Sequence, residues 1–171
     1  WVDWALDRLG PLGRVGTMGE SLGAAVSLQH AAIDARVAFT IADCAFSDLT
    51  ELLKYRLRCD YHLPAFPLLH LANVWCGLLS WMTFEQVSPL RDMPHVKTPV
   101  MFIHGENDDY IPPQMSRAMY AAKTSGLRWL YIVPEAKHAR AWAADPVAYE
   151  QEVGKFLLAV GLGQSTQVEA V

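Results

Sequence analysis

The pentad Gly19-Glu20-Ser21-Leu22-Gly23 constrains the fold of this chain more than any other segment. It follows a short apolar run at residues 15–18 and precedes an Ala-rich stretch at 22–31. In this setting a Gly-x-Ser-x-Gly pattern is typical of a nucleophile elbow, where a strand ends in a sharp turn that carries a serine and a helix begins directly behind it. By itself such a pentad arises by chance in roughly one chain of this length in twenty, so its meaning depends on the rest of the sequence.

The residues of the pentad have separate expected roles. Because they lack a Cβ, Gly19 and Gly23 would let the turn close tightly and let the new helix lie against neighbouring strands. The Oγ of Ser21 would then be exposed above the sheet. The amide of Leu22 would lie at the helix N-terminus, where N–H groups have no partner inside the helix, and we therefore expect it to be one oxyanion donor.

Composition favours one folded core and argues against nucleic acid as a partner. The chain has 171 residues, of which 52% are hydrophobic and 19% are charged, so a mainly disordered protein is not expected. Its net charge is -4 and no run of Lys and Arg is present. Phosphate binding needs clustered positive charge, so the sequence does not predict a nucleic-acid interface.

The cysteines and histidines do not form a recognisable metal or disulfide pattern. Three cysteines are present and no C-x-x-C pair occurs, which favours a reducing compartment and hence a cytoplasmic protein. His62, His70 and His95 lack the spacing of a metal site. We expect no metal and no cofactor, and the sequence has no signature of an oligomeric state.

Strand-like and helix-like segments alternate along the chain. An N-terminal helical pattern without signal-peptide features ends at Gly10-Pro11. The expected strands cover residues 15–18, 37–42, 100–104 and 127–133, and the expected later helices cover 22–31, 113–123 and 146–160. This alternation predicts a mainly parallel sheet with helices on both faces, whose catalytic groups gather at the carboxyl ends of the strands.

Residues 46–96 interrupt the alternation and are interpreted as a helical cap insertion. Aromatic residues are spread through this interval among mixed helical and proline-containing sequence. Residues 63–82 are apolar over about the length of a membrane span, but Pro64, Pro67, His70 and Asn73 interrupt them. A membrane association is therefore not expected, although a peripheral protein that docks on lipid through this segment stays a rival hypothesis.

Three residues that follow strands suit nucleophilic catalysis. His138 can accept the proton of Ser21 and later donate it to a leaving group, while the carboxylate of Asp108 fixes the imidazole tautomer. Asp43, which follows the second expected strand, is the reserve candidate for the acid. His104 ends a buried strand and is interpreted as a hydrogen-bonded, partly buried residue without a catalytic role.

Three sequence blocks resemble the α/β-hydrolase superfamily, and within it the bacterial serine hydrolases of esterase and dipeptidyl-peptidase-like type. They are residues 15–24, residues 99–112 and Lys137-His138-Ala139 before a terminal helix. The order Ser, Asp, His is that of α/β-hydrolases. In the family a strand ends in His-Gly and the acid comes three residues after that Gly, so the resemblance implies Asp108 rather than Asp109 as the acid.

The resemblance implies an α/β-hydrolase fold fragment and a serine hydrolase. The expected core covers 1–45 and 97–160, the cap or lid covers 46–96, and 161–171 is a loose tail. The implied activity is cleavage of an ester, thioester or peptide substrate through an acyl-enzyme, without a cofactor. The family's first strands and second oxyanion amide would precede Trp1, so we expect a protein of about 250 to 300 residues and a fragment that can be inactive alone.

A non-catalytic alternative stays open. The same fold can bind a small ligand or a protein partner in its pocket without hydrolysis. The presence of Ser21, Asp108 and His138 together favours the enzyme, whereas the kind of bond cleaved is not indicated by the sequence.

Overall fold

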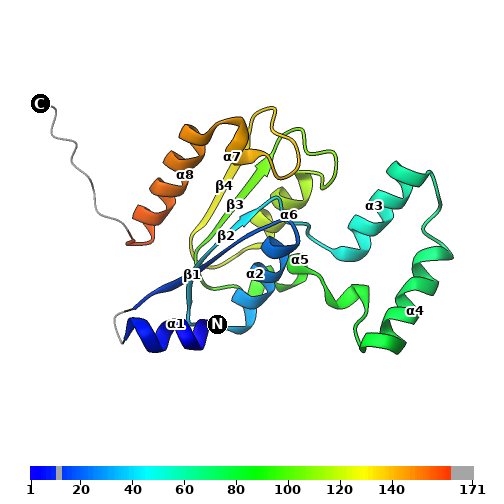
Figure 1. The fold of residues 1–171 in the computed structure, drawn as a ribbon, viewed down its shortest axis with the longest axis horizontal. Helices are drawn as coiled ribbons and strands as arrows, with labels where there is room; N and C mark the ends of the chain where they lie inside the picture. The colour runs from blue at the N-terminus through cyan, green and yellow to red at the C-terminus, as the bar shows by residue number, and fades with distance from the viewer. Residues whose placement is uncertain (11–12, 163–171) are drawn as a thin grey trace, which may run out of the picture.

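The computed structural model describes residues 1–10 and 13–162, and it has a parallel sheet between two layers of helices (Figure 1). The described strands pair in the order β1-β2-β3-β4. The strands are β1 (Val15–Glu20), β2 (Val37–Asp43), β3 (Val100–Gly105) and β4 (Arg128–Val133). All four lie where the sequence predicts strands, and every neighbouring pair is parallel. The predicted α/β architecture is thus confirmed.

The four helices that the sequence predicts individually, at the N-terminus and at 22–31, 113–123 and 146–160, are present with small shifts at their ends. Six of the described helices are α1 (Val2–Leu9), α2 (Leu22–Ile33), α5 (Pro89–Asp92), α6 (Gln114–Ala122), α7 (Ala141–Ala144) and α8 (Pro146–Ala159). The remaining helical elements are α3 (Leu49–Tyr61), α4 (Leu68–Ser80) and the 3-10 turns η1 (Phe84–Gln86) and η2 (Met93–His95). The four-residue α7 has too few residues for its period to be read from the sequence.

Alternation along β3 divides the core between the two faces of the sheet. Val100 and Phe102 pack with Met119 of α6 and with residues of α2, while Met101 and Ile103 pack with Phe156 of α8. All six residues of β3 are buried, because helices cover both faces of this inner strand. β1 ends the sheet and is only partly buried.

The predicted cap interval contains two kinds of structure. Figure 1 shows α3 and α4 projecting away from the sheet, and α4 has no buried residue. Met93 and Val96, near the end of the interval, are instead fully buried in the core cluster beneath α2. The 46–96 boundaries of the insertion therefore stay a prediction, and its last residues contribute to the core.

The apolar side chains of α1 and α4 are exposed in the described structure. Trp1, which precedes α1, is 95% exposed, Trp4 within α1 is 54% exposed, and no residue of this helix is buried. The helix predicted at the N-terminus is present and contacts β1, but its apolar residues Val2, Ala5 and Leu6 are only half-buried. The predicted apolar segment at 63–82 forms the 13-residue α4. No helix in the described ranges is long and apolar enough to cross a membrane. Most of the predicted loose tail, 163–171, lies outside the described residues.

Candidate active site

Ser21 occupies a sharp turn between β1 and α2. Its backbone has φ 53° and ψ -115°, a conformation that non-glycine residues rarely adopt. Its N–H donates to the carbonyl oxygen of Asp43 on the neighbouring strand at 2.8 Å. A Cβ at Gly19 would collide with the backbone of Gly23 and Ala24, so this position needs glycine. The strand, turn and helix of the predicted elbow are therefore present.

The two glycines of the pentad differ. A Cβ built at Gly23 meets no heavy atom within 4 Å among the described residues. The close approach that we predicted for Gly23 is thus not found in this part of the molecule. Leu22 begins α2, and its N–H belongs to the first turn, where no intrahelical partner exists.

Asp108 lies in the loop after β3 and its carboxylate is surrounded by donors. Its Oδ1 accepts the N–H groups of Tyr110 at 2.9 Å and of Ile111 at 2.8 Å. Its Oδ2 lies 2.8 Å from Nδ1 of His138 and 3.2 Å from Nε2 of His104. The side chain is fully buried. Both oxygens therefore have two donors each, which holds the carboxylate in one orientation.

Hydrogen bonding outweighs burial in the electrostatics of Asp108. Burial by itself opposes the charged form, but hydrogen bonds from the His104 ring, the Ile111 N–H and the His138 ring together lower the pKa of Asp108 below its usual value. The carboxylate is therefore charged at neutral pH. A charged acceptor favours the tautomer of His138 that carries its proton on Nδ1.

His138 joins the acid to the serine. It lies in the loop between β4 and α7, and its side chain is 22% exposed. With the proton of the neutral ring on Nδ1, Nε2 is an acceptor, and it lies 3.1 Å from Oγ of Ser21. Asp108 and His138 are 30 positions apart in the sequence, and Ser21 and His138 are 117 positions apart. The three predicted residues nevertheless form one continuous hydrogen-bonded chain.

His104 supports the acid from beneath the loop. Its ring is completely buried, with Nδ1 2.7 Å from Oγ of Ser116 and Nε2 2.8 Å from the carbonyl oxygen of Ile111. Because both neighbours of Nε2 are acceptors, the proton lies on Nε2 and Ser116 donates to Nδ1. The predicted hydrogen-bonded role is confirmed, and the ring is more deeply buried than we expected. Its contact with Asp108 was missed, although the i, i+4 spacing of His104 and Asp108 could have suggested it.

The structure does not bring the reserve acid to the histidine. Oδ2 of Asp43 accepts the hydroxyl of Tyr149 at 3.1 Å, and its Oδ1 is buried without a hydrogen-bond partner in the described residues. Burial raises the pKa of Asp43 to about 6, against the opposing effect of the Tyr149 hydrogen bond. Asp108, rather than Asp43, is the carboxylate bonded to His138.

Cys44 is a neighbour of the site that the sequence analysis did not single out. It has φ 45° and is buried at the end of β2. In the described ranges, Cys44, Asp108 and His138 are the one set of three possible metal ligands with donor atoms within 4.8 Å of one another. Burial raises the pKa of the Cys44 thiol to about 12, and the other two side chains are already bonded to each other, so the set is poorly suited to a metal.

Helix α3 contacts the acid loop. Nη1 of Arg56 donates to the carbonyl oxygen of Asp109 at 2.9 Å, and the Tyr55 hydroxyl donates to the same oxygen at 3.2 Å. The Arg56 guanidinium lies 4.2 Å from the ring centre of Tyr110. The Tyr110 ring in turn lies 4.9 Å from that of His138. Sequence reasoning missed this stack because no local pattern joins α3 to the loop at 108–111.

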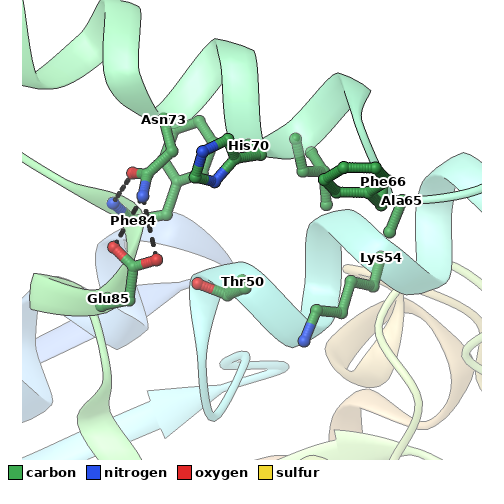
Figure 2. Close-up of a pocket in the computed structure, with 9 residues that line it drawn as sticks. Thr50, Lys54, Ala65, Phe66, His70, Asn73, Phe84 and Glu85 are labelled. Atoms are coloured by element: carbon green, nitrogen blue, oxygen red, sulfur yellow. Dashed lines mark hydrogen bonds between the residues drawn. The ribbon is translucent and has the colours of Figure 1, made fainter.

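A separate cavity of about 250 Å³ lies between α3, α4 and η1. Figure 2 shows Lys54 and Thr50 on α3 and Phe66, His70 and Asn73 from the α4 region, together with Phe84 and Glu85. The Asn73 amide donates to both oxygens of Glu85 at 2.9 Å. None of the residues of the Ser21–His138–Asp108 chain lines this cavity.

Comparison with known proteins agrees with this fold. The chain is 37% identical over 147 residues to the Bacillus subtilis protein YqkD. The matched residues make up 85% of this chain and 48% of YqkD. The chain thus spans about half the length of this curated relative.

Solved structures share the architecture at low sequence identity. A Pyrococcus furiosus esterase matches with a TM-score of 0.69 and 19% identity, over 92% of this chain and 59% of its own. The Pyrococcus horikoshii acylaminoacyl peptidase matches with a TM-score of 0.64 and 17% identity, over 92% of this chain and 25% of its own. Both likenesses bear on the fold, and they confirm that the chain is a portion of an α/β-hydrolase fold. Residues 7–160 match the prolyl oligopeptidase family, and the chain belongs to this family.

Proposed function

We propose that the protein is a serine hydrolase in which Ser21 is the nucleophile, His138 the general base and Asp108 the residue that orients the base. The observation that supports this proposal most directly is the continuous hydrogen-bonded chain from Ser21 Oγ through the His138 ring to a buried, charged Asp108. A strained turn at the nucleophile is a second support, since it exposes the hydroxyl at the strand end.

The reaction follows from the acceptor and donor roles of these atoms. Nε2 of His138 takes the Ser21 proton as Oγ attacks the substrate carbonyl carbon and the carbonyl electrons move onto oxygen. The protonated ring then gives that proton to the leaving alcohol, thiol or amine as the acyl-enzyme forms. Water, deprotonated by the same ring, attacks the acyl-enzyme and releases the acid and Ser21. The negative charge of Asp108 stabilises the imidazolium in both halves.

The Leu22 amide is the proposed donor to the oxyanion within this chain. It begins α2 beside Ser21, and the first-turn amides of a helix are unpaired and carry partial positive charge. A single donor is less than such sites commonly use, and the loss of one donor reduces turnover by about a hundredfold to a thousandfold. We propose that a second amide comes from the full-length protein outside this sequence.

The proposed substrates are esters, thioesters or peptides, chosen in part by α3 and α4. Both helices project beyond the sheet, and α3 reaches the acid loop through Arg56. The esterase and the peptidase among the structural neighbours keep both kinds of bond open. Rates for matched p-nitrophenyl esters, thioesters and anilides with the full-length protein would assign the bond type. The free cysteines, Cys44, Cys59 and Cys76, support a reducing compartment such as the cytoplasm.

A fluorophosphonate probe tests the nucleophile. The full-length protein should be labelled, and Ser21→Ala should abolish labelling because the probe reacts only with an activated serine. Ser27→Ala is a matched control, since Ser27 lies on the same helix and its hydroxyl donates to the Gly23 carbonyl. Labelling that persists in Ser21→Ala would contradict the proposal. A burst of p-nitrophenol from a short-chain ester would separate the enzyme from a non-catalytic binding module.

A further inference from the structure

Asp43 has a carboxylate that the proposed reaction does not use and that the described structure leaves half satisfied. The residue is 5% exposed, and one oxygen accepts the Tyr149 hydroxyl. The other oxygen, Oδ1, is buried and has no partner among the described residues. Buried polar atoms are nearly always paired in folded proteins, so an orphaned carboxylate oxygen calls for a missing donor.

Asp43 lines a cavity at the carboxyl ends of β1 and β2. This cavity has a volume of about 380 Å³ and is lined by Met18, Gly19, Glu20, Asp43, Trp142 and Tyr149. Glu20 and Asp43 are register partners on the two parallel strands. Neither of them takes part in an ion pair with any described residue. Two carboxylates without an ion pair, that of the buried Asp43 and that of the exposed Glu20, therefore belong to residues that line one hollow.

The walls decide which kind of donor fits. A hard metal ion such as Ca²⁺ needs six or more oxygen ligands. Met18, Gly19 and Trp142 form much of the cavity lining, and none of them has a side-chain oxygen. Trp142 is 55% exposed, and its indole N–H is held by Glu150 at 3.2 Å. Aromatic faces beside carboxylates favour an organic cation, which gains charge-assisted hydrogen bonds and cation–π contact together.

We propose that the cavity between Glu20, Asp43, Trp142 and Tyr149 is a binding site for a guanidinium or primary ammonium group. The bound cation neutralises the pair of carboxylates. It donates to Oδ1 of Asp43 after the side chain turns toward the cavity, because that oxygen has no exposed surface in the described structure. The site adjoins the nucleophile, because the backbone carbonyl of Asp43 accepts the Ser21 N–H at 2.8 Å. A bound cation would therefore stabilise the end of β2, to which the Ser21 turn is hydrogen-bonded.

Two sources supply the same chemistry. One is a small organic cation from solution, including a charged group of a substrate. The other is an Arg or Lys side chain of the full-length protein that lies outside the described residues. A free cation would exchange and compete, whereas a built-in side chain would fill the site permanently and contribute to folding.

The first arm of the test titrates n-propylguanidinium into the full-length protein and follows the Trp142 indole N–H signal by NMR, assigned with Trp142→Phe. A free-ligand site gives a saturable shift, and Asp43→Asn weakens the binding at least tenfold. Glu152→Gln is the matched control, because Glu152 lies on the same helix as Tyr149 but bonds to Trp129 and Lys155. It should change the affinity less than twofold.

The second arm measures the melting temperature of the full-length protein and Asp43→Asn at pH 8. A built-in cation makes the wild type insensitive to n-propylguanidinium and makes Asp43→Asn melt at a lower temperature, because the cation loses its partner. If no cation is bound, Asp43→Asn should melt at a higher temperature than the wild type, because the substitution removes a buried charge. The proposal is overturned if the wild type shows no saturable shift and Asp43→Asn does not lower the melting temperature. Neither readout needs hydrolysis, so the outcome is independent of the proposed function.

Discussion

Asp43 ends β2 and Asp108 follows the neighbouring parallel strand β3, and both side chains are almost completely buried. Their pKa values are nevertheless shifted in opposite directions. Asp108 has two donors on each oxygen and a lowered pKa. Asp43 has one donor on one oxygen, none on the other, and a pKa raised to about 6. The residue type and the position at the end of a strand are the same, so the number of donors decides which carboxylate stays charged.

The largest expected difference between the two carboxylates is in catalysis. We predict that Asp108→Asn lowers kcat for an ester substrate roughly ten-thousandfold, because the amide favours the wrong tautomer of the histidine. Asp43→Asn should change kcat by less than about tenfold, since no described hydrogen bond joins Asp43 to His138. Steady-state kinetics of the full-length protein measure both values. A larger loss in Asp43→Asn than in Asp108→Asn would show that the acid has been assigned to the wrong strand.

The second difference is the sign of the pH dependence of stability. The pKa of Asp43 is raised from 3.8 to about 6 by burial, so its contribution to stability is largest below pH 3.8 and is lost as the pH rises through about 6. Without an organic cation, Asp43→Asn should raise the free energy of unfolding of this chain at pH 8 by up to about 3 kcal/mol.

At pH 4 the same Asn variant should change stability little, because the wild-type carboxyl is then largely protonated in the folded chain. Urea denaturation at the two pH values makes the comparison. The lowered pKa of Asp108 has the opposite consequence, since its stabilising contribution is present above pH 3.8 and disappears as the pH falls through the folded value. A free energy of unfolding at pH 8 that is lower for Asp43→Asn than for the wild type would contradict the prediction that no cation is bound in this chain.

A smaller effect is expected beneath the acid loop. Ser116→Ala leaves Nδ1 of the buried His104 without a donor, which should cost about 1–3 kcal/mol in the free energy of unfolding. Because His104 still offers Nε2–H to the Ile111 carbonyl and to Asp108, activity should fall only a fewfold. Ser27→Ala, on an exposed helix face, should change stability by less than about 0.5 kcal/mol. Denaturation at pH 7 compares the two, and equal effects would deny His104 a structural role.

Local motifs explain how much could be predicted. The strands at 37–43 and 100–105 are mostly apolar runs, and the elbow depends on Gly19, whose missing Cβ is needed by the turn itself. The residues of the Ser21–His138–Asp108 chain each follow a strand, so the parallel topology alone gathers them at one edge of the sheet. These features are encoded within a few residues of each other or in the order of the elements.

Contacts between distant segments could not be predicted in this way. The orphaned oxygen of Asp43 depends on which side chains of α7 and α8 reach the end of β2. The apolar sides of α1 and α4 follow a helical period, and that period predicts an amphipathic helix whether or not anything covers it. Likewise, the stack of Arg56, Tyr110 and His138 joins three segments with no shared pattern.

The smallest predicted effect concerns this stack. It tests whether α3, through Arg56 and Tyr110, positions the ring of His138. A stacked aromatic pair contributes about 0.5–1.5 kcal/mol, so Tyr110→Ala should lower kcat about twofold to tenfold, while Tyr110→Phe should keep most of the activity. Arg56→Met should act in the same direction with a smaller loss. Arg128→Met is the matched control, since Arg128 lies 4.7 Å from the ring centre of Tyr120, a residue of α6 that packs against the core. Kinetics of the full-length variants decide the point: if Arg56→Met and Arg128→Met reduce kcat equally, the guanidinium over Tyr110 stabilises the fold only, and α3 has no influence on His138.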